Sequence, residues 1–272
     1  MKVQNKNIVV TGAGGGMGRQ LVLALLNKGA GVAAIDINKE ALDETASLAG
    51  KNGTNLSCYV LDITNNLAVI ETVDVILKQF KTIDGLINNA GIIQAFVGVN
   101  ELDYDKIDRV FNVNFWGTLY LTKAFLPHLL TRPEAHIVNV SSMGGFMSFP
   151  TQTIYGASKA AVKILTEGLY AELKDSAVRV TVIHPGAIAT NITVNSGLAG
   201  PAVDAGNSKN EGMALSPVIA ADLIIKAMEK NKFRATIGKD AWVLDKLYRL
   251  SPKIATNFIG KMMKKSLARQ GS

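Results

Sequence analysis

The chain has 272 residues, of which 48% are hydrophobic and 19% charged, and this composition predicts a globular protein with the full core of one large α/β domain or two small ones. The formal net charge is +7, but seven Lys and Arg and a single acid lie from Ala241 onward, so residues 1–240 are nearly neutral. This distribution gives no reason to expect nucleic acid as a partner. Because the start before Val10 is short and polar and no apolar run is long enough for a bilayer, we expect a soluble cytoplasmic protein without a signal peptide or a membrane span.

Short β-branched runs alternate with longer segments of helical period along residues 1–240. The predicted strands are 7–11, 31–36, 56–62, 83–88, 136–141, 178–184 and 234–237, and the predicted helices are 18–28, 39–48, 67–80, 105–130, 153–174 and 217–230. This alternation favours βαβ units and a parallel sheet that is covered on both faces. The single cysteine, Cys58, falls in the third strand, where we expect a small buried core residue and no redox role.

Residues 191–216 break this alternation, because they are rich in Gly, Ser, Asn and Ala and have weak periodicity. Loops of this length inside a compact domain often serve as lids. The position just after a strand favours a substrate-binding loop at 190–216, with ordinary surface disorder as the alternative. Its apolar side chains favour a moderately apolar substrate: Ile192, Val194, Leu198, Val203, Met213 and Leu215.

A glycine-rich turn follows the first predicted strand and opens the first predicted helix, with the sequence Thr11-Gly12-Ala13-Gly14-Gly15-Gly16-Met17-Gly18. Glycines leave room for a pyrophosphate to approach the backbone and the free N–H groups of a helix start. The spacing departs from G-x-G-x-x-G, so a turn that serves only chain geometry is the alternative for this motif taken alone.

Asp36 ends the second predicted strand, where an acid can accept hydrogen bonds from the adenosine ribose and repel a 2′-phosphate. Neither the glycine loop nor the two positions after Asp36 hold a Lys or Arg. These charges favour NAD over NADP as the cofactor. The alternative role of Asp36, a helix cap, does not conflict with the first.

Ser142, Tyr155 and Lys159 form the strongest chemical signal. Tyr155 and Lys159 are four residues apart, so on a helix their side chains share a face, where an ammonium group can lower the phenol pKa. A phenol with such a pKa can give or take a proton. The pair by itself occurs by chance in many helices, and only its combination with the other motifs carries weight.

Together these motifs resemble the short-chain dehydrogenase/reductase family over about residues 5–240. Thr11, Gly12, Gly16 and Gly18 meet its T-G-x-x-x-G-x-G pattern, and Met17 lies within that pattern. The other matching positions are Asp62 with the adjacent Ile63, the Asn88-Asn89-Ala90-Gly91 segment, Asn114, Ser142, Tyr155, Lys159, and Pro185-Gly186 followed by Thr190.

The resemblance implies a single Rossmann-type doubly wound α/β domain with a seven-stranded parallel sheet. It implies hydride transfer between NAD(H) and a carbonyl or secondary alcohol, with the substrate oxygen held by Ser142 and Tyr155, and Tyr155 exchanging a proton. Lys159 would bind the nicotinamide ribose, and Asn114 would anchor a relay water. The family's usual homodimer or homotetramer would form through the helices predicted at 105–130 and 153–174.

No metal site is expected, because His128, His136 and His184 lack the spacing of ligands and sit on or beside apolar runs. Structural roles suit all three.

The family pattern ends at Asp240, and residues 241–272 read as a basic helical extension with helices at 241–250 and 252–267. In the second helix, one face is predicted to carry Ile254, Ala255, Phe258, Ile259, Met262 and Met263, with lysines opposite. Three roles stay open: peripheral contact with anionic lipid, a wall for an apolar substrate, and docking on the protein's own body or a second subunit.

Two other classes of function stay open beside the enzyme. One is a sensor or scaffold that binds NAD(H) without turnover, and the other is a protein of the membrane surface whose main body is secondary. The complete set of Ser142, Tyr155 and Lys159 argues against the first, because a pure binder does not need a tuned phenol.

Overall fold

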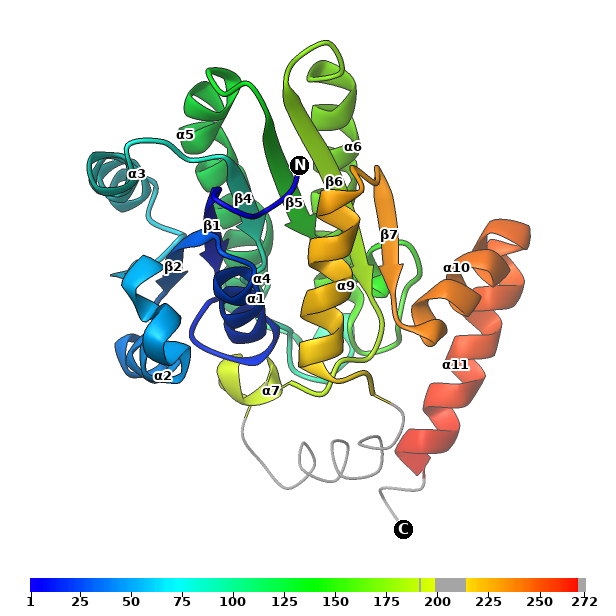
Figure 1. Ribbon diagram of the computed structural model, residues 1–272. Coiled ribbons are helices and arrows are strands. Elements are labelled where there is room, and N and C mark those ends of the chain that lie inside the picture. The colour runs from blue at the N-terminus through cyan, green and yellow to red at the C-terminus, as the bar shows by residue number, and fades with distance from the viewer. Residues whose placement is uncertain (191, 199–213, 269–272) are drawn as a thin grey trace.

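The structure is a computed structural model that describes residues 1–190, 192–198 and 214–268, with side chains described up to 263. Seven parallel strands form one sheet in the order β3-β2-β1-β4-β5-β6-β7 (Figure 1). The strands are β1 (Asn7–Thr11), β2 (Gly31–Asp36), β3 (Leu56–Val60), β4 (Gly85–Asn88), β5 (Ala135–Val140), β6 (Val178–Pro185) and β7 (Arg234–Ile237). The predicted doubly wound fold with seven parallel strands is therefore confirmed.

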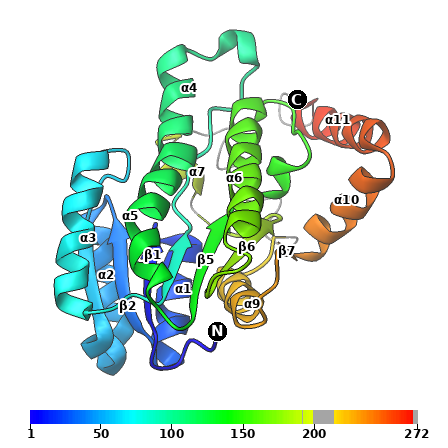
Figure 2. The same ribbon diagram turned by 90° about the horizontal axis from the view of Figure 1, so that it is seen from above.

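Helices cover both faces of the sheet, as Figure 2 shows. One face packs against α1 (Gly16–Asn27), α2 (Lys39–Ala49) and α9 (Pro217–Glu229). The other packs against α3 (Asn66–Phe80), α5 (Thr118–Leu130) and α6 (Thr153–Glu172). Because the central strands are buried from both sides, they read as continuous apolar runs rather than as alternating patterns.

The helix predicted at 105–130 is interrupted in the structure. It consists of α4 (Tyr104–Phe111), a π-helical turn at Asn112–Gly117 and α5. Apolar spacing does not reveal the π turn, because the chain stays helical on both sides of it. Turns of this kind are often found at functional sites, and this one carries Asn114.

The substrate-loop prediction lies largely outside the described residues, which omit 191 and 199–213, among them Val203 and Met213. The described part begins with a short helix, α7 (Ile192–Asn195). Ser196 follows it, and its hydroxyl accepts a hydrogen bond from the Ile93 amide at 3.0 Å. This end of the loop therefore contacts the segment after Gly91.

After β7 the chain forms α10 (Lys239–Leu250) and α11 (Pro252–Ala268). The single apolar face predicted for α11 is wrong in part. Ala255 and Ile259 are buried against Met147, and Met263 packs beside them, whereas Ile254, Phe258 and Met262 are exposed. One stripe of a helix is enough to pack on the body, so the neighbouring stripe stays outside.

The expectation that Cys58 is buried is also wrong. Cys58 is exposed on β3, which lies at the edge of the sheet and is only partly covered by α2. An edge strand reads like an inner strand in sequence, because burial depends on what packs beside it.

Candidate active site

The predicted site residues gather at one edge of the sheet, the lower edge in Figure 1, where the parallel strands have their carboxyl ends. The strand order reverses between β1 and β4, and ligands of doubly wound sheets bind outside such a reversal. Residues from the ends of β1, β2, β4, β5 and β6 therefore surround one region.

The glycine loop between β1 and α1 has the geometry of an anion cradle. Gly12 and Gly16 adopt positive φ values of 65° and 51°. A Cβ on Gly18 would lie 1.8 Å from the Gly12 oxygen, so no other residue fits there. Helix α1 begins at Gly16, next to Met17, without a side-chain cap, which leaves its first N–H groups for a ligand such as a pyrophosphate.

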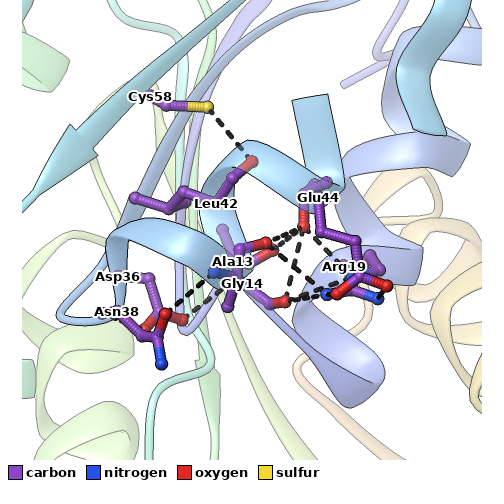
Figure 3. Close-up of polar contacts among 10 residues, drawn as sticks. Ala13, Gly14, Arg19, Asp36, Asn38, Leu42, Glu44 and Cys58 are labelled. Carbon is purple, nitrogen blue, oxygen red and sulfur yellow. Dashed lines mark hydrogen bonds and ion pairs between the residues drawn. The ribbon is translucent and has the colours of Figure 1, made fainter. Parts of the chain in front are cut away.

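Asp36, at the end of β2, faces this loop (Figure 3). One carboxylate oxygen accepts a hydrogen bond from the Gly14 amide at 2.8 Å, and the other accepts one from the Asn38 amide at 3.0 Å. The suggested cap role belongs to Asn38 instead, whose side chain accepts from the Ala41 amide at the start of α2. Asp36 thus places a negative charge beside the glycine loop.

Arg19, which follows the glycine motif, was missed by sequence reasoning. Its guanidinium donates to the Gly14 carbonyl and forms an ion pair with Glu44 at 2.6 Å (Figure 3). It also donates to Thr45. These bonds attach the glycine loop to α2.

The segment after β4 is fixed to the end of β1. The Thr11 hydroxyl accepts hydrogen bonds from the amides of Asn89 and Ala90, both at 3.0 Å. A Cβ on Gly91 would lie 2.9 Å from Lys159 Nζ, so a larger residue at this position would displace the lysine ammonium group.

Asp62 and Ile63 follow β3 on the same edge. Asp62 is exposed, and its carboxylate accepts hydrogen bonds from the amide and hydroxyl of Thr64 at 2.9 and 2.8 Å. Ile63 is buried and packs against Gly117 of the π turn, where a Cβ would lie 2.6 Å from it.

Ser142 and Tyr155 meet, although thirteen residues separate them. Ser142 follows β5, Tyr155 lies in the first turn of α6, and a Cβ on Gly144 would lie 3.5 Å from both the Ser142 hydroxyl oxygen and the Tyr155 ring. Burial raises the pKa of Tyr155 above its usual value, and the nearby Ser142 hydroxyl lowers it by less. The expectation that Lys159 lowers this pKa is therefore wrong here, because the cost of burying a phenolate dominates. A phenol with a raised pKa is protonated at neutral pH and can donate its proton.

Lys159 lies one turn after Tyr155 in α6 and is buried. Its ammonium donates to the Val140 carbonyl at 3.0 Å, and burial lowers its pKa to about 8. A cation held in this way lies ready to donate to a hydroxyl group of a ligand.

Asn114 is fully buried in the π turn. Its side-chain oxygen accepts from the Ile92 amide at 2.8 Å, and its nitrogen donates to the Ile92 carbonyl and to Ser158 of α6. It therefore links the segment after β4 to the helix of Tyr155 and Lys159.

Gln94 also belongs to the site, and sequence reasoning missed it. It is buried, and its side-chain oxygen accepts hydrogen bonds from the amides of Ile154 and Tyr155 at 2.7 and 2.9 Å. Helix α6 has no cap from Gln152, the residue at its own start, so Gln94 supplies that cap from a distant segment. The available signal was Gln152 at the N-cap position of α6, where Ser, Thr, Asp and Asn are preferred.

The turn after β6 is fixed by the start of α10. The carboxylate of Asp240 accepts from the Ala187 amide at 2.7 Å, and a Cβ on Gly186 would lie 2.2 Å from that carboxylate. Pro185 ends β6, and the side chain of Thr190 lies beside Gly16, 3.2 Å from where a Cβ would be. Of these predicted positions, Thr190 therefore lies next to the glycine loop, whereas Gly186 lies against Asp240 of α10.

A groove of about 480 Å³ adjoins the segment between Ser142 and Tyr155. One wall comes from that segment and the start of α6, the other from α11. The lining residues are Ser148, Phe149, Pro150, Thr153, Thr256, Asn257, Gly260 and Lys261.

The histidines do not form a metal site. His136 and His184 are buried on separate strands, His128 is exposed, and no cluster of three metal-binding side chains occurs among the described residues. Burial lowers the pKa of His184 to about 4, and its Nδ1 lies 3.0 Å from the Ser142 carbonyl oxygen.

Known proteins match the chain in both sequence and structure. Residues 6–199 match the short chain dehydrogenase family. The putative oxidoreductase SadH of Mycobacterium tuberculosis is 36% identical over 253 residues, which cover 91% of each chain. The chain belongs to the short-chain dehydrogenase/reductase family, a family of oxidoreductases.

Solved structures of the family are similar in fold and carry a nicotinamide cofactor. A short-chain dehydrogenase/reductase from Burkholderia phymatum in complex with NAD aligns with a TM-score of 0.85 at 26% identity, covering 93% of this chain and 96% of that one. A short-chain dehydrogenase from Burkholderia cenocepacia in complex with NADP aligns with a TM-score of 0.79 at 29% identity, covering 95% and 99%. A nicotinamide cofactor is therefore supported for this chain at the level of NAD or NADP.

Proposed function

We propose that the protein transfers a hydride between NAD(H) and a carbonyl or secondary alcohol, with Tyr155 as the acid and base. The observation that carries this proposal is that Ser142 and Tyr155 both lie against Gly144, with buried Lys159 one turn after Tyr155 in α6 and beside Gly91. When bound, the cofactor supplies or accepts the hydride.

The chain's own residues handle the oxygen and the proton. Ser142 and the Tyr155 hydroxyl hydrogen-bond the substrate oxygen, and Tyr155 donates its proton in the direction of carbonyl reduction. Lys159 binds the ribose of the nicotinamide, and Asn114 anchors a water that returns the proton. The Tyr155 phenol is protonated at neutral pH and is therefore in the form that this direction requires.

The cofactor-binding part of the proposal assigns the pyrophosphate to Gly12, Gly16, Met17 and Gly18. The adenosine half lies at Asp36, Asp62 and Ile63, and the nicotinamide half is assigned to the remaining predicted positions: Thr11, Asn89, Ala90, Gly91, Tyr155, Lys159, Pro185, Gly186 and Thr190. NAD is preferred over NADP, because Asp36 repels a second phosphate and Arg19 is already paired with Glu44.

The substrate we propose is an apolar alcohol or ketone of lipid, steroid or similar type. Phe149 and Pro150 in the groove wall, and the apolar cluster of Met147, Phe146 and α11 behind it, support this class. The predicted extension at 241–272 would then take part in substrate binding through α11.

Assembly and location complete the proposal. A homodimer or homotetramer through α4, α5 and α6 is supported by exposed Tyr104 on α4, Trp116 in the π turn before α5 and Ile164 on α6. Sedimentation equilibrium at several protein concentrations checks the oligomeric state.

A cytoplasmic location stays a prediction. Within the described residues no helix has the length and apolarity to cross a membrane.

The deciding experiment measures NADH absorbance with purified protein and a panel of ketones and secondary alcohols, including sterols and long-chain compounds. We expect the wild type to turn over one or more of these compounds. In Tyr155→Phe the rate should fall by roughly a thousandfold or more, as for removal of a general acid. Binding of NADH, followed by fluorescence, should persist in that variant. If NADH binds tightly and no compound is turned over, the protein is a sensor or scaffold instead; normal activity in Tyr155→Phe would remove the mechanism.

A further inference from the structure

Helices α10 and α11 carry several large apolar side chains that are exposed and do not pack against the rest of the protein. They stand beside β7, at the end of the sheet far from α2 and α3 (Figure 1). The exposed side chains lie on both helices, and their exposure reaches 85% at Leu250 and 61% at Ile254, on either side of the turn between the helices. We call these residues the hairpin face: Trp242, Val243, Leu250, Ile254, Phe258 and Met262.

The charges around the hairpin face have one sign. Lys239, Lys246, Lys253 and Lys261 are exposed on the same two helices. The two acids between residues 239 and 263 are both engaged, Asp240 with the Ala187 amide and Asp245 with Arg234 and Arg249. The face therefore combines apolar and cationic side chains without a free carboxylate.

The body of the protein does not cover this face. Helix α11 packs on the body through a different stripe, which lies beside the hairpin face and places Ala255 and Ile259 against Met147. A second copy is a poor partner, because a twofold interface brings the same surface of each copy together and would set lysines against lysines. An anionic partner matches the charge, and a bilayer also accepts Trp and Phe at its interface.

We propose that the hairpin face binds the surface of an anionic lipid bilayer. The apolar side chains enter the boundary between headgroups and acyl chains, and the lysines bind lipid phosphates and carboxylates. This attachment lies on the surface of the membrane. It does not depend on the enzymatic activity, so its test needs no substrate.

The test is co-sedimentation of the full chain with vesicles of phosphatidylcholine alone or mixed with phosphatidylserine. We expect binding only to the mixed vesicles, weakening as salt is raised. Lys246→Gln/Lys253→Gln/Lys261→Gln should bind roughly a hundredfold more weakly, since each lysine near an anionic surface contributes roughly fivefold. The matched control, Lys51→Gln/Lys78→Gln/Lys123→Gln, removes the same charge from exposed sites elsewhere and should bind like the wild type.

A second pair of variants tests the apolar contribution. Trp242→Ser/Phe258→Ser should lose most binding, whereas Leu67→Ser/Ile70→Ser, which changes exposed apolar residues on α3, should not. Thermal unfolding and NADH binding check that each variant is folded. In Trp116→Phe, Trp242 is the one remaining tryptophan, and its emission should shift to the blue with the mixed vesicles.

Several results would overturn the proposal. Protein that stays in the supernatant with both vesicle types excludes a lipid surface, as does equal binding by the hairpin variants and their controls. If Trp242→Ser/Phe258→Ser instead converts an oligomer to a smaller species, the face joins copies of the chain.

Discussion

Asp36 carries the proposed preference for NAD over NADP, two cofactors that differ by one phosphate. Asp36→Ala should weaken NADH binding and strengthen NADPH binding, so that the ratio of the two Kd values moves by at least roughly tenfold, because the repulsion of the 2′-phosphate is removed. Fluorescence titration with both nucleotides measures this ratio. Asp43→Ala, on the exposed side of α2 and paired with Lys39, is the control. An unchanged ratio in Asp36→Ala would assign the preference to other residues.

Gln94 acts on Tyr155 through the helix that carries it. Gln94→Leu removes the acceptor of two amide hydrogen bonds, and we expect kcat to fall roughly tenfold while the Kd for NADH stays the same, since misplacement of an acid by a fraction of an ångström is costly. Gln94→Glu keeps an acceptor oxygen at the start of α6 and should restore most of kcat.

Equal losses of kcat in the two Gln94 variants would contradict this positioning role. A general loss of packing would also lower NADH affinity and thermal stability in parallel, so both are measured beside kcat.

At the scale of elements, α11 forms one wall of the groove beside the active site. Gly260 lines this groove, and no atom lies within 4 Å of the place where its Cβ would be. Gly260→Trp should therefore fill the groove and raise KM for long substrates by roughly tenfold or more, with little effect on small ketones, because a bulky side chain takes the place of the substrate. Initial rates over a series of chain lengths measure this.

The control for the groove is Gly168→Trp in α6, where the corresponding space is also open. If both tryptophan variants behave alike toward long substrates, the groove of α11 does not hold the substrate.

The elements differ in how far they could be predicted. Strands β1, β2 and β7 begin and end at the predicted residues, because Gly or Asp beside a β-branched run marks where a strand ends. The π turn around Asn114 could not be predicted, since the contacts that Asn114 makes there are with the distant residues Ile92 and Ser158. Likewise the hairpin face depends on which stripe of α11 meets Met147, and amphipathic spacing does not decide that.

At the scale of the whole molecule, buried histidines should make stability depend on pH. Burial lowers the pKa of His136 to about 3 and of His184 to about 4, so between these values and about 6.5 the unfolded chain binds protons that the folded chain does not. The free energy of unfolding should therefore fall as the pH is lowered through this window. Denaturant unfolding at a series of pH values measures the slope.

His184→Asn should flatten this slope between pH 6.5 and 4, whatever its effect on absolute stability at neutral pH. A slope that His184→Asn does not alter would mean that other groups bind the protons.

The sequence by itself determined the sheet, the covering helices and the positions of the site motifs, because hydrophobic period and glycine requirements act over a few residues. The family and its expected chemistry followed from Thr11 to Gly18 and from Ser142, Tyr155 and Lys159. Tertiary structure alone decided the cap that Gln94 gives α6, the attachment of Arg19 to Glu44 and the exposure of Cys58. It also decided that burial raises the pKa of Tyr155. Each of these depends on which distant segments lie side by side, and local sequence does not record that.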